Sequence, residues 1–253
     1  MRELDYEKLG SDITEWIKTY VHNARAPGVV MGLSGGIDSA TTAALCAQAV
    51  GEDRVVTLGL PCHSLLADLE DARIVANHLG LKFLVIDLTS THEQLLKALP
   101  PEIESTQMAI ANVKPRLRMT TIYYVGQSLG GLLVAGTGNR AEIAVGYFTK
   151  YGDGGVDFEP LGDLYKCEVR ALAKELNLPK KIIERPPSAG LWEGQTDEEE
   201  IGMCYDDLDE ILYRMDHELA LDDLDDGKVQ KVKKMVRASY HKKHMPPIFR
   251  IDK

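Results

Sequence analysis

Residues 34–39, with the sequence SGGIDS, combine small residues, two hydroxyls and a carboxylate in a pattern suited to binding a nucleotide. An apolar run precedes them and an alanine-rich run follows, which predicts a strand, a tight glycine turn and a helix start. Backbone N–H groups in such a turn can approach a phosphate closely, and the helix dipole favours negative charge there. Asp38 alone would repel phosphate, so the pattern implies a metal ion between the two.

The glycine turn differs from a Walker A loop because no Gly-Lys-Ser/Thr follows it. It resembles instead the pyrophosphate loop of the ATP pyrophosphatases, which split ATP into AMP and pyrophosphate. A lone Ser-Gly-Gly is more often a structural turn. All six residues, set between a strand and a helix, favour a nucleotide loop.

The order of the predicted elements indicates an α/β fold that positions this loop. Apolar runs predict strands at 28–33, 55–60, 83–86 and 132–135. Helical spacing predicts helices at 3–23, 67–79, 91–99, 104–112 and 115–129. This alternation predicts a parallel, doubly wound sheet flanked by helices, with ligands at the carboxyl ends of the strands. The 34–39 loop and the GTGN sequence at 136–139 both follow such ends.

The second half of the chain is less regular. Residues 146–162 are glycine-rich and predict a long functional loop. Helices are predicted at 165–176 and 179–184, with a loop at 185–196. Residues 197–226 are acidic but keep helical spacing, which predicts a solvated amphipathic helix, and a basic helix is predicted at 227–244.

Composition narrows the class of protein. The 253 residues, 44% of them hydrophobic, can form one domain spanning 1–253, and the net charge of −10 argues against a nucleic-acid surface. No apolar run reaches transmembrane length and the N-terminus is no secretory signal, so we expect a cytoplasmic protein with no membrane contact. The scattered Cys46, Cys62, Cys167 and Cys204 predict buried free thiols rather than a disulfide or zinc site.

Several further segments carry a closer family resemblance. GLSGGIDS (32–39), NVKPRLRM (112–119), GTGNRAE (136–142), FTKYGDGGVDFEPL (148–161) and PPSAGLWEGQTDEE (186–199) together resemble ammonia-dependent NAD synthetases, over nearly the whole chain. The resemblance implies the Rossmann-like ATP pyrophosphatase fold, classed as adenine nucleotide alpha hydrolase-like. It also implies a reaction in which ATP adenylates the nicotinate carboxylate of deamido-NAD, releasing pyrophosphate. Ammonia then displaces AMP to give NAD.

The resemblance implies roles for residues around ATP. Asp38 and Glu142 match the positions that bind Mg²⁺, which prefers carboxylate, phosphate and water oxygens. Glu142 alone would suggest only a first-turn glutamate opposing the helix dipole. Lys166 is expected to offset the charge on the departing pyrophosphate. The expected ATP-binding residues are Gly32, Leu33, Ser34, Gly35, Gly36, Ile37, Asp38, Ser39, Thr137, Lys166 and Ser188.

On the acceptor side, the resemblance implies that deamido-NAD contacts Arg116, Lys150, Asp157, His241 and Lys242. Two phosphates and a carboxylate need cationic donors, and arginine can bind an anion bidentately. Asp153 is a second expected catalytic residue, because a carboxylate near the acyl carbon could attract ammonium and take its proton. A turn-stabilising aspartate between glycines is the alternative for Asp153.

Two other function classes are compatible with parts of the pattern. Another ATP pyrophosphatase, such as a GMP synthetase or a tRNA-modifying synthetase, would be expected to show a cysteine pair or a basic surface. A non-catalytic nucleotide-binding protein would be expected to lose Asp38, Glu142 or Lys166. Glutamine use would need an amidase domain for which the chain has no room, so ammonia comes from solution or a partner. The family implies a homodimer, and the apolar helix at 117–129 suits either its interface or the core.

Overall fold

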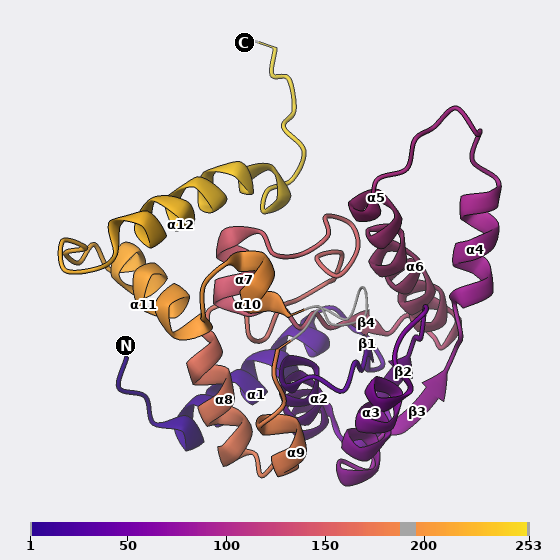
Figure 1. Ribbon diagram of the computed structural model, residues 1–253. Coiled ribbons are helices and arrows are strands. Elements are labelled where there is room, and N and C mark those ends of the chain that lie inside the picture. The colour runs from indigo at the N-terminus through magenta and orange to yellow at the C-terminus, as the bar shows by residue number, and fades with distance from the viewer. Residues whose placement is uncertain (1, 188–195, 252–253) are drawn as a thin grey trace.

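The computed structural model describes residues 2–187 and 196–251 (Figure 1). Its sheet contains β1 (Val29–Gly32), β2 (Val55–Gly59), β3 (Lys82–Val85) and β4 (Leu133–Val134). The strand order is β3-β2-β1-β4 and every pairing is parallel, which confirms the predicted α/β class. After β1 the chain first builds β2 and β3 on one side, and only later adds β4 on the other. The loops that follow β1 and β4 therefore flank a topological switch point.

Alternating side chains on the strands form a core on each face of the sheet. Val29 and Met31 of β1 join one cluster with the helices α1 (Tyr6–Asn23), α2 (Ile37–Val50), α3 (Leu66–His78), α8 (Lys166–Glu175) and α9 (Lys180–Ile183). Val30 points to the other face, where the packed helix is α6 (Val113–Ser128). The helices α4 (Thr89–Lys97) and α5 (Gln107–Ala111) lie beside α6 (Figure 1). The two-residue period of a strand thus places helices on both faces.

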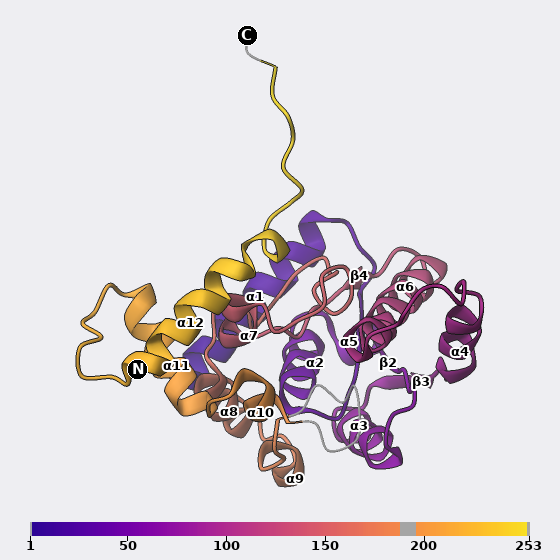
Figure 2. The same cartoon turned by 45° about the horizontal axis from the view of Figure 1, so that its top comes forward.

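A separate apolar cluster lies beyond α8, away from the sheet (Figures 1 and 2). It joins α7 (Arg140–Val145), α10 (Asp197–Ile201), α11 (Tyr205–Asp216) and α12 (Asp226–Ala238). The prediction of one helix over 197–226 was wrong, because Gly202 adopts a φ of +74° and ends α10 before α11 begins. The amphipathic pattern was right, since Leu208, Ile211 and Leu212 are buried. The last predicted helix is also shorter and gives way to a 3-10 turn at Tyr240–Lys242.

The remaining features divide between confirmed and corrected predictions. Residues 146–162 form no helix, and Phe158 makes a single parallel bridge with Ala135. All four cysteines are free, but only Cys46 and Cys62 are buried, whereas Cys167 is half-buried and Cys204 is exposed. None of the helices in the described part of the chain is long and apolar enough to span a bilayer.

Candidate functional site

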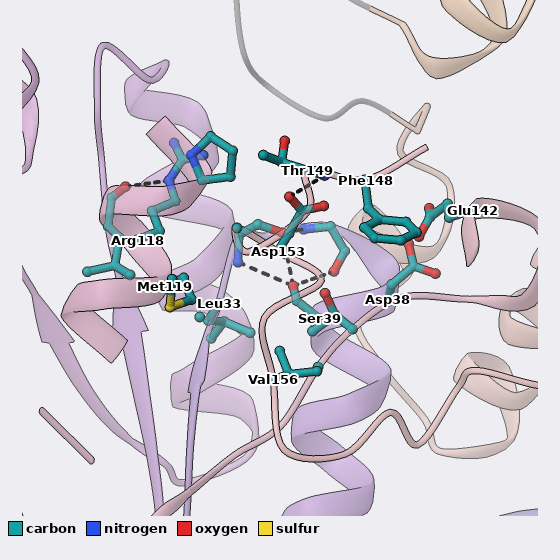
Figure 3. Close-up of a pocket in the computed structure, with 18 of the residues that line it drawn as sticks. Leu33, Asp38, Ser39, Arg118, Met119, Glu142, Phe148, Thr149, Asp153 and Val156 are labelled. Carbon is teal, nitrogen blue, oxygen red and sulfur yellow. Dashed lines mark hydrogen bonds between the residues drawn. The ribbon is translucent and has the colours of Figure 1, made fainter. Parts of the chain in front are cut away.

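A cavity of about 620 Å³ opens at the carboxyl ends of the strands, at the switch point of the sheet (Figure 3). Its walls come from the loops after β1 and β4, from α6 and from the segment 146–156. Predicted site residues on its wall are Gly32, Leu33, Ser34, Gly36, Ile37, Asp38, Ser39, Thr137, Glu142, Asp153, Lys166 and Lys242. The chain therefore brings most of the expected ATP-side residues into one space.

The loop after β1 is held in shape by its own hydroxyls. Ser34 Oγ accepts a hydrogen bond from the Gly36 N–H at 3.2 Å and lies 3.1 Å from Ser39 Oγ. The Ser39 hydroxyl lies 3.0 Å from the Gly36 carbonyl and donates to it. Gly35 has a φ of +80°, and a Cβ there would lie 2.7 Å from the Asp68 carbonyl oxygen of α3. Only glycine fits this turn, so the loop can present its backbone N–H groups to an anion.

Lys166, at the first turn of α8, lies between two carboxylates at the bottom of the cavity. Its Nζ lies 2.5 Å from Asp38 Oδ2 and 3.4 Å from Glu142 Oε1, and its side chain is only 2% exposed. Asn139, which is fully buried, donates from Nδ2 to Asp38 Oδ1 at 3.1 Å. Asn139 also forms a reciprocal capping box with Glu142 at the start of α7. Residues from three distant parts of the chain thus converge on one cationic position.

The electrostatics of this group favour an added cation. Burial raises the pKa of Glu142 to about 7, with Lys166 opposing the shift and Asp38 adding to it. Burial alone would lower the pKa of Lys166, but Asp38 and Glu142 together hold it above its ordinary value. The residues fit magnesium because two hard oxygen ligands already converge on one positive charge. The described residues contain no cluster of three His, Cys, Asp or Glu side chains able to hold a metal, so phosphate and water would complete its coordination.

Asp153 lies in the turn 151–155, with its carboxylate directed toward Thr149, and it lines the cavity together with Ser39 (Figure 3). Its Oδ1 accepts a hydrogen bond from the Thr149 N–H at 2.9 Å. The residue keeps an accessible surface toward the cavity, yet the protein atoms packed around the carboxyl group raise its pKa above the ordinary value by desolvation. A carboxylate in this position can accept a proton more readily than a solvated aspartate.

The predicted acceptor-side residues divide into two groups. Arg116 Nε donates to the Lys150 carbonyl at 3.4 Å, and Lys150 Nζ donates to the His241 carbonyl at 2.6 Å. Lys242 Nζ donates to the Gly146 and Phe148 carbonyls, both at 2.8 Å, and is the member of this chain of contacts that lines the cavity. Arg116 and Lys150 are thus joined to the backbone at His241, beside Lys242.

Asp157 lies apart from that group. Its Oδ2 accepts from the Val134 N–H at 2.7 Å and its Oδ1 accepts from the Tyr123 hydroxyl at 2.9 Å. It is not among the residues that line the cavity, and neither are Gly35, Arg116, Lys150 and His241. Ser188 lies outside the described residues, so the expected hydroxyl contact with ATP has no structural account.

Other residues of the site were missed from the sequence. Arg118 lines the cavity, where its guanidinium donates to the Leu60 carbonyl at 3.0 Å and to Ser64 Oγ at 3.2 Å. Desolvation by burial lowers the pKa of Arg118. Asp197 also lines the cavity. Both residues stand in segments that carried the family resemblance, so the signal was present, but a single chain does not say which polar residues of a segment face inward.

Glu159 supports the loop after β4. Its Oε2 accepts from the Gly138 N–H at 3.0 Å. A Cβ on Gly136 would lie 2.3 Å from the Glu159 carboxylate, so the glycine allows this close approach. Burial raises the pKa of Glu159 to about 8. This carboxyl group therefore fixes the turn that carries Thr137.

Comparisons with known proteins agree with this geometry. A family model described as NAD synthase matches residues 9–246. The NH3-dependent NAD+ synthetase of Archaeoglobus fulgidus is 46% identical over 251 residues, which cover 98% of each chain. The solved NH3-dependent NAD synthetase of Campylobacter jejuni has a TM-score of 0.84 and 33% identity, covering 98% of this chain and 100% of that one. The solved NMN synthetase of Francisella tularensis has a TM-score of 0.90 and 31% identity, with the same coverage.

Proposed function

The chain belongs to the NAD synthase family, and on this premise we propose that it amidates deamido-NAD with ammonia in an ATP-dependent reaction. The products are NAD, AMP and pyrophosphate. One observation carries the proposal: the 34–39 loop, two convergent carboxylates and a buried lysine meet in one cavity at the switch point of the sheet. No protein nucleophile is needed, because ATP activates the substrate carboxylate.

In the first step a nicotinate carboxylate oxygen attacks the α-phosphorus, and the bond from that phosphorus to the oxygen bridging the α- and β-phosphates breaks. The backbone N–H groups at the start of α2 would hold the leaving pyrophosphate. Lys166 would turn its ammonium from Asp38 and Glu142 toward the phosphate oxygens, where it offsets the developing charge. Thr137 and Ser188 are proposed to contribute hydroxyl contacts with ATP.

Asp38 and Glu142 are proposed to hold Mg²⁺. When bound, the ion would supply Lewis-acid stabilisation of the leaving pyrophosphate. Asn139 orients both carboxylates, because it donates to Asp38 and caps the helix that carries Glu142. This arrangement limits the reorganisation required when the nucleotide enters.

In the second step ammonia attacks the acyl carbon, the carbon–oxygen bond to AMP breaks and a proton is lost. Asp153 is proposed to attract ammonium and accept that proton, which is consistent with its raised pKa. Lys242 and the linked Arg116, Lys150 and His241 are proposed to bind the anionic groups of deamido-NAD. A contact by Asp157 stays a prediction of the resemblance, because both its carboxylate oxygens are used within the fold.

The same family implies a cellular setting, which we also propose. The chain acts as one domain in a cytoplasmic homodimer that takes ammonia from solution or from a partner. Tyr124 of α6 and Leu129, which follows this helix, are 73% and 42% exposed, and they offer an apolar surface for a second copy.

A smaller acceptor is the second candidate. The TM-score of 0.90 with the Francisella tularensis NMN synthetase favours a test of nicotinate mononucleotide as the amidated substrate. The identity of 46% with the Archaeoglobus fulgidus enzyme, against 31% with the NMN synthetase, favours deamido-NAD.

The deciding experiment incubates folded protein with ATP, Mg²⁺ and ammonium, together with deamido-NAD or nicotinate mononucleotide. NAD, NMN and pyrophosphate are quantified by chromatography. We expect NAD and pyrophosphate in equal amounts and a higher kcat/KM for deamido-NAD. No NAD above the enzyme-free control would overturn the proposal. A higher kcat/KM for nicotinate mononucleotide would make it, rather than deamido-NAD, the proposed substrate.

A further inference from the structure

Two tyrosine hydroxyls and two carboxylates form a connected row of contacts that begins at Glu142. The Tyr205 hydroxyl lies 3.3 Å from Glu142 Oε1 and 3.1 Å from Asp197 Oδ2. The Tyr147 hydroxyl lies 3.2 Å from Asp197 Oδ1. Tyr205 and Asp197 are 1% and 4% exposed, so these contacts are shielded from water. The mechanism above assigns no role to either residue.

Tyr205 contacts both charged partners of the candidate cation site. Its hydroxyl reaches Glu142, and Lys166 Nζ lies 5.0 Å from the centre of its ring. A phenol has one hydrogen to donate, whereas two carboxylates face this hydroxyl. The contacts at 3.1 and 3.3 Å hold the hydroxyl between the two carboxylates, and it can donate to one of them at a time.

The same contacts connect the short helix α10 to the site. Asp197 is the first residue of α10, and Glu198 of α10 accepts a hydrogen bond from the Tyr205 N–H at 2.9 Å. Glu142 belongs to α7 and Tyr205 to α11, so the hydroxyl joins three helices. The Tyr205 hydroxyl is therefore one contact through which a change in the position of α10 can reach Glu142.

We propose that Tyr205 is a positioning residue for Glu142 and Lys166, and that Asp197 acts on them through the Tyr205 hydroxyl. This inference rests on the proposed function only in taking Glu142 as a ligand of Mg²⁺ with bound ATP. Donors that orient a ligating carboxylate typically change metal affinity by about 10–100-fold. Asp197 thereby couples the docking of α10 to the binding of the divalent cation.

The Tyr205→Phe variant separates the hydroxyl from the packing of the ring. The ring keeps its apolar contacts and its contact with Lys166, while the bonds to Glu142 and Asp197 are lost. Tyr213→Phe is the matched control on the same helix, because its ring packs against Tyr165 and His217 and, among the described residues, makes no contact with Asp38, Glu142 or Lys166. A purely structural role of the α11 tyrosines predicts similar effects from both variants.

The measurement is calorimetric binding of α,β-methylene ATP, an analogue that cannot release pyrophosphate, in excess Mg²⁺ and in EDTA. The dissociation constant in EDTA divided by the dissociation constant in excess Mg²⁺ reports the contribution of the cation to binding without turnover. We expect this ratio to fall about 10-fold in Tyr205→Phe and to stay at the wild-type value in Tyr213→Phe. An unchanged ratio in folded Tyr205→Phe overturns the proposal, as does a wild-type protein in which Mg²⁺ has no effect.

A double-mutant cycle tests the path through the hydroxyl. Asp197→Asn replaces the charged acceptor with an amide, and we expect a several-fold smaller ratio in the wild-type background. In the Tyr205→Phe background the same change should have no further effect. A persistent effect there would show that the Asp197 charge acts directly on the cation, and would overturn the coupling through Tyr205. If Tyr205→Phe does not fold, a wild-type ratio in Asp197→Asn alone overturns it.

A failure of the calorimetric test can be distinguished from a failure of the NAD assay. Failure of the NAD assay with a normal Mg²⁺ effect on the analogue would refute the reaction and leave the role of Tyr205 open to the same calorimetric test. Success of the NAD assay with an unchanged ratio in Tyr205→Phe would refute the positioning role alone.

Discussion

The Lys166 ammonium nitrogen lies 2.5 Å from Asp38 Oδ2, although the two residues are 128 positions apart in the sequence. The lysine is buried, so its charge depends on Asp38 and on Glu142 at 3.4 Å. Removing one partner from a buried ion pair leaves an uncompensated charge and costs about 3–5 kcal/mol of stability. These residues therefore contribute both to folding and to the proposed chemistry.

Substitution of this lysine should affect turnover most strongly. We expect Lys166→Met to lower kcat by about 10²–10³-fold, because the leaving pyrophosphate loses its cationic partner. Pyrophosphate release under saturating ATP and deamido-NAD is the measurement, with a thermal melt to monitor folding. Lys174→Met, an exposed position on the same helix, is the control and should keep wild-type kcat. A kcat within threefold of wild type in Lys166→Met would refute the proposed role.

The turn at Gly35 should not tolerate a side chain. In Gly35→Ala the new Cβ would meet the Asp68 carbonyl at 2.7 Å, and the residue would also carry a φ of +80°. We expect a fall in melting temperature and a KM for ATP raised by at least 10-fold. Gly131→Ala is the matched control, because Gly131 has a φ of +88° but nothing within 4 Å of its Cβ position. The control should show only the backbone strain, of about 1 kcal/mol. Equal effects of the two substitutions would contradict the steric argument.

The stability of the protein should depend on pH through Glu159. Its folded-state pKa is about 8 against an ordinary value of 4.5, so the folded chain holds a proton that the unfolded chain releases. Stability contributed by this group is therefore present below pH 4.5 and lost as the pH rises through 8. Chemical denaturation of wild type and Glu159→Gln at several pH values is the measurement. The difference between them should change by on the order of 5 kcal/mol over that interval, and a constant difference would refute the shift.

Asp153 should control the use of ammonium. We expect Asp153→Asn to raise the KM for ammonium and to lower kcat by about 10²-fold, because the group that accepts the proton is lost. The adenylation half-reaction should be less affected, which pyrophosphate release without ammonium can test. Asp222→Asn, an exposed position, provides the control. Full turnover of Asp153→Asn across an ammonium titration would leave the aspartate with only its turn-stabilising hydrogen bond from Thr149.

The proposed dimer gives a simpler prediction. Tyr124→Glu would place a charge on the exposed apolar surface of α6, and we expect it to convert a dimer into a monomer. Light scattering of wild type and variant at the concentration used in the assay is the measurement. A monomeric wild-type protein would exclude the dimer.

The parts of the fold that follow local rules could be predicted from the sequence. Each strand is a short run of mainly apolar residues beside a glycine or a polar turn, so the positions of the four strands and the parallel type of the sheet were predicted, whereas the strand order was not. The helix predicted over 197–226 was too long. A glycine in the left-handed conformation ends the helix there, although the helical spacing of apolar residues continues beyond it. Burial of α11 also depends on α7 and α12, which local periodicity does not reveal.

The site was predictable only where a side chain belongs to a motif. Asp38, Glu142 and Lys166 were named from their segments and lie together in the structure. Tyr205 was missed because a phenol reaches Glu142 across 63 positions and carries no motif of its own. Asp157 was expected to face the substrate, whereas its carboxylate bonds to Val134 and Tyr123. The spacing of residues in the sequence does not show which polar side chain will accept a hydrogen bond from a given backbone N–H.

The bonds of Asp157 also have a consequence for the solubility of the folded chain. β4 is a terminal strand of the sheet, and its side away from β1 would offer an unpaired backbone to other molecules. Asp157 occupies that side: its N–H donates to the Val134 carbonyl at 2.9 Å, and its carboxylate accepts from the Val134 N–H at 2.7 Å. One residue thus imitates a neighbouring strand. Replacing it with alanine would leave the Val134 N–H without this acceptor, at an edge where another chain could pair.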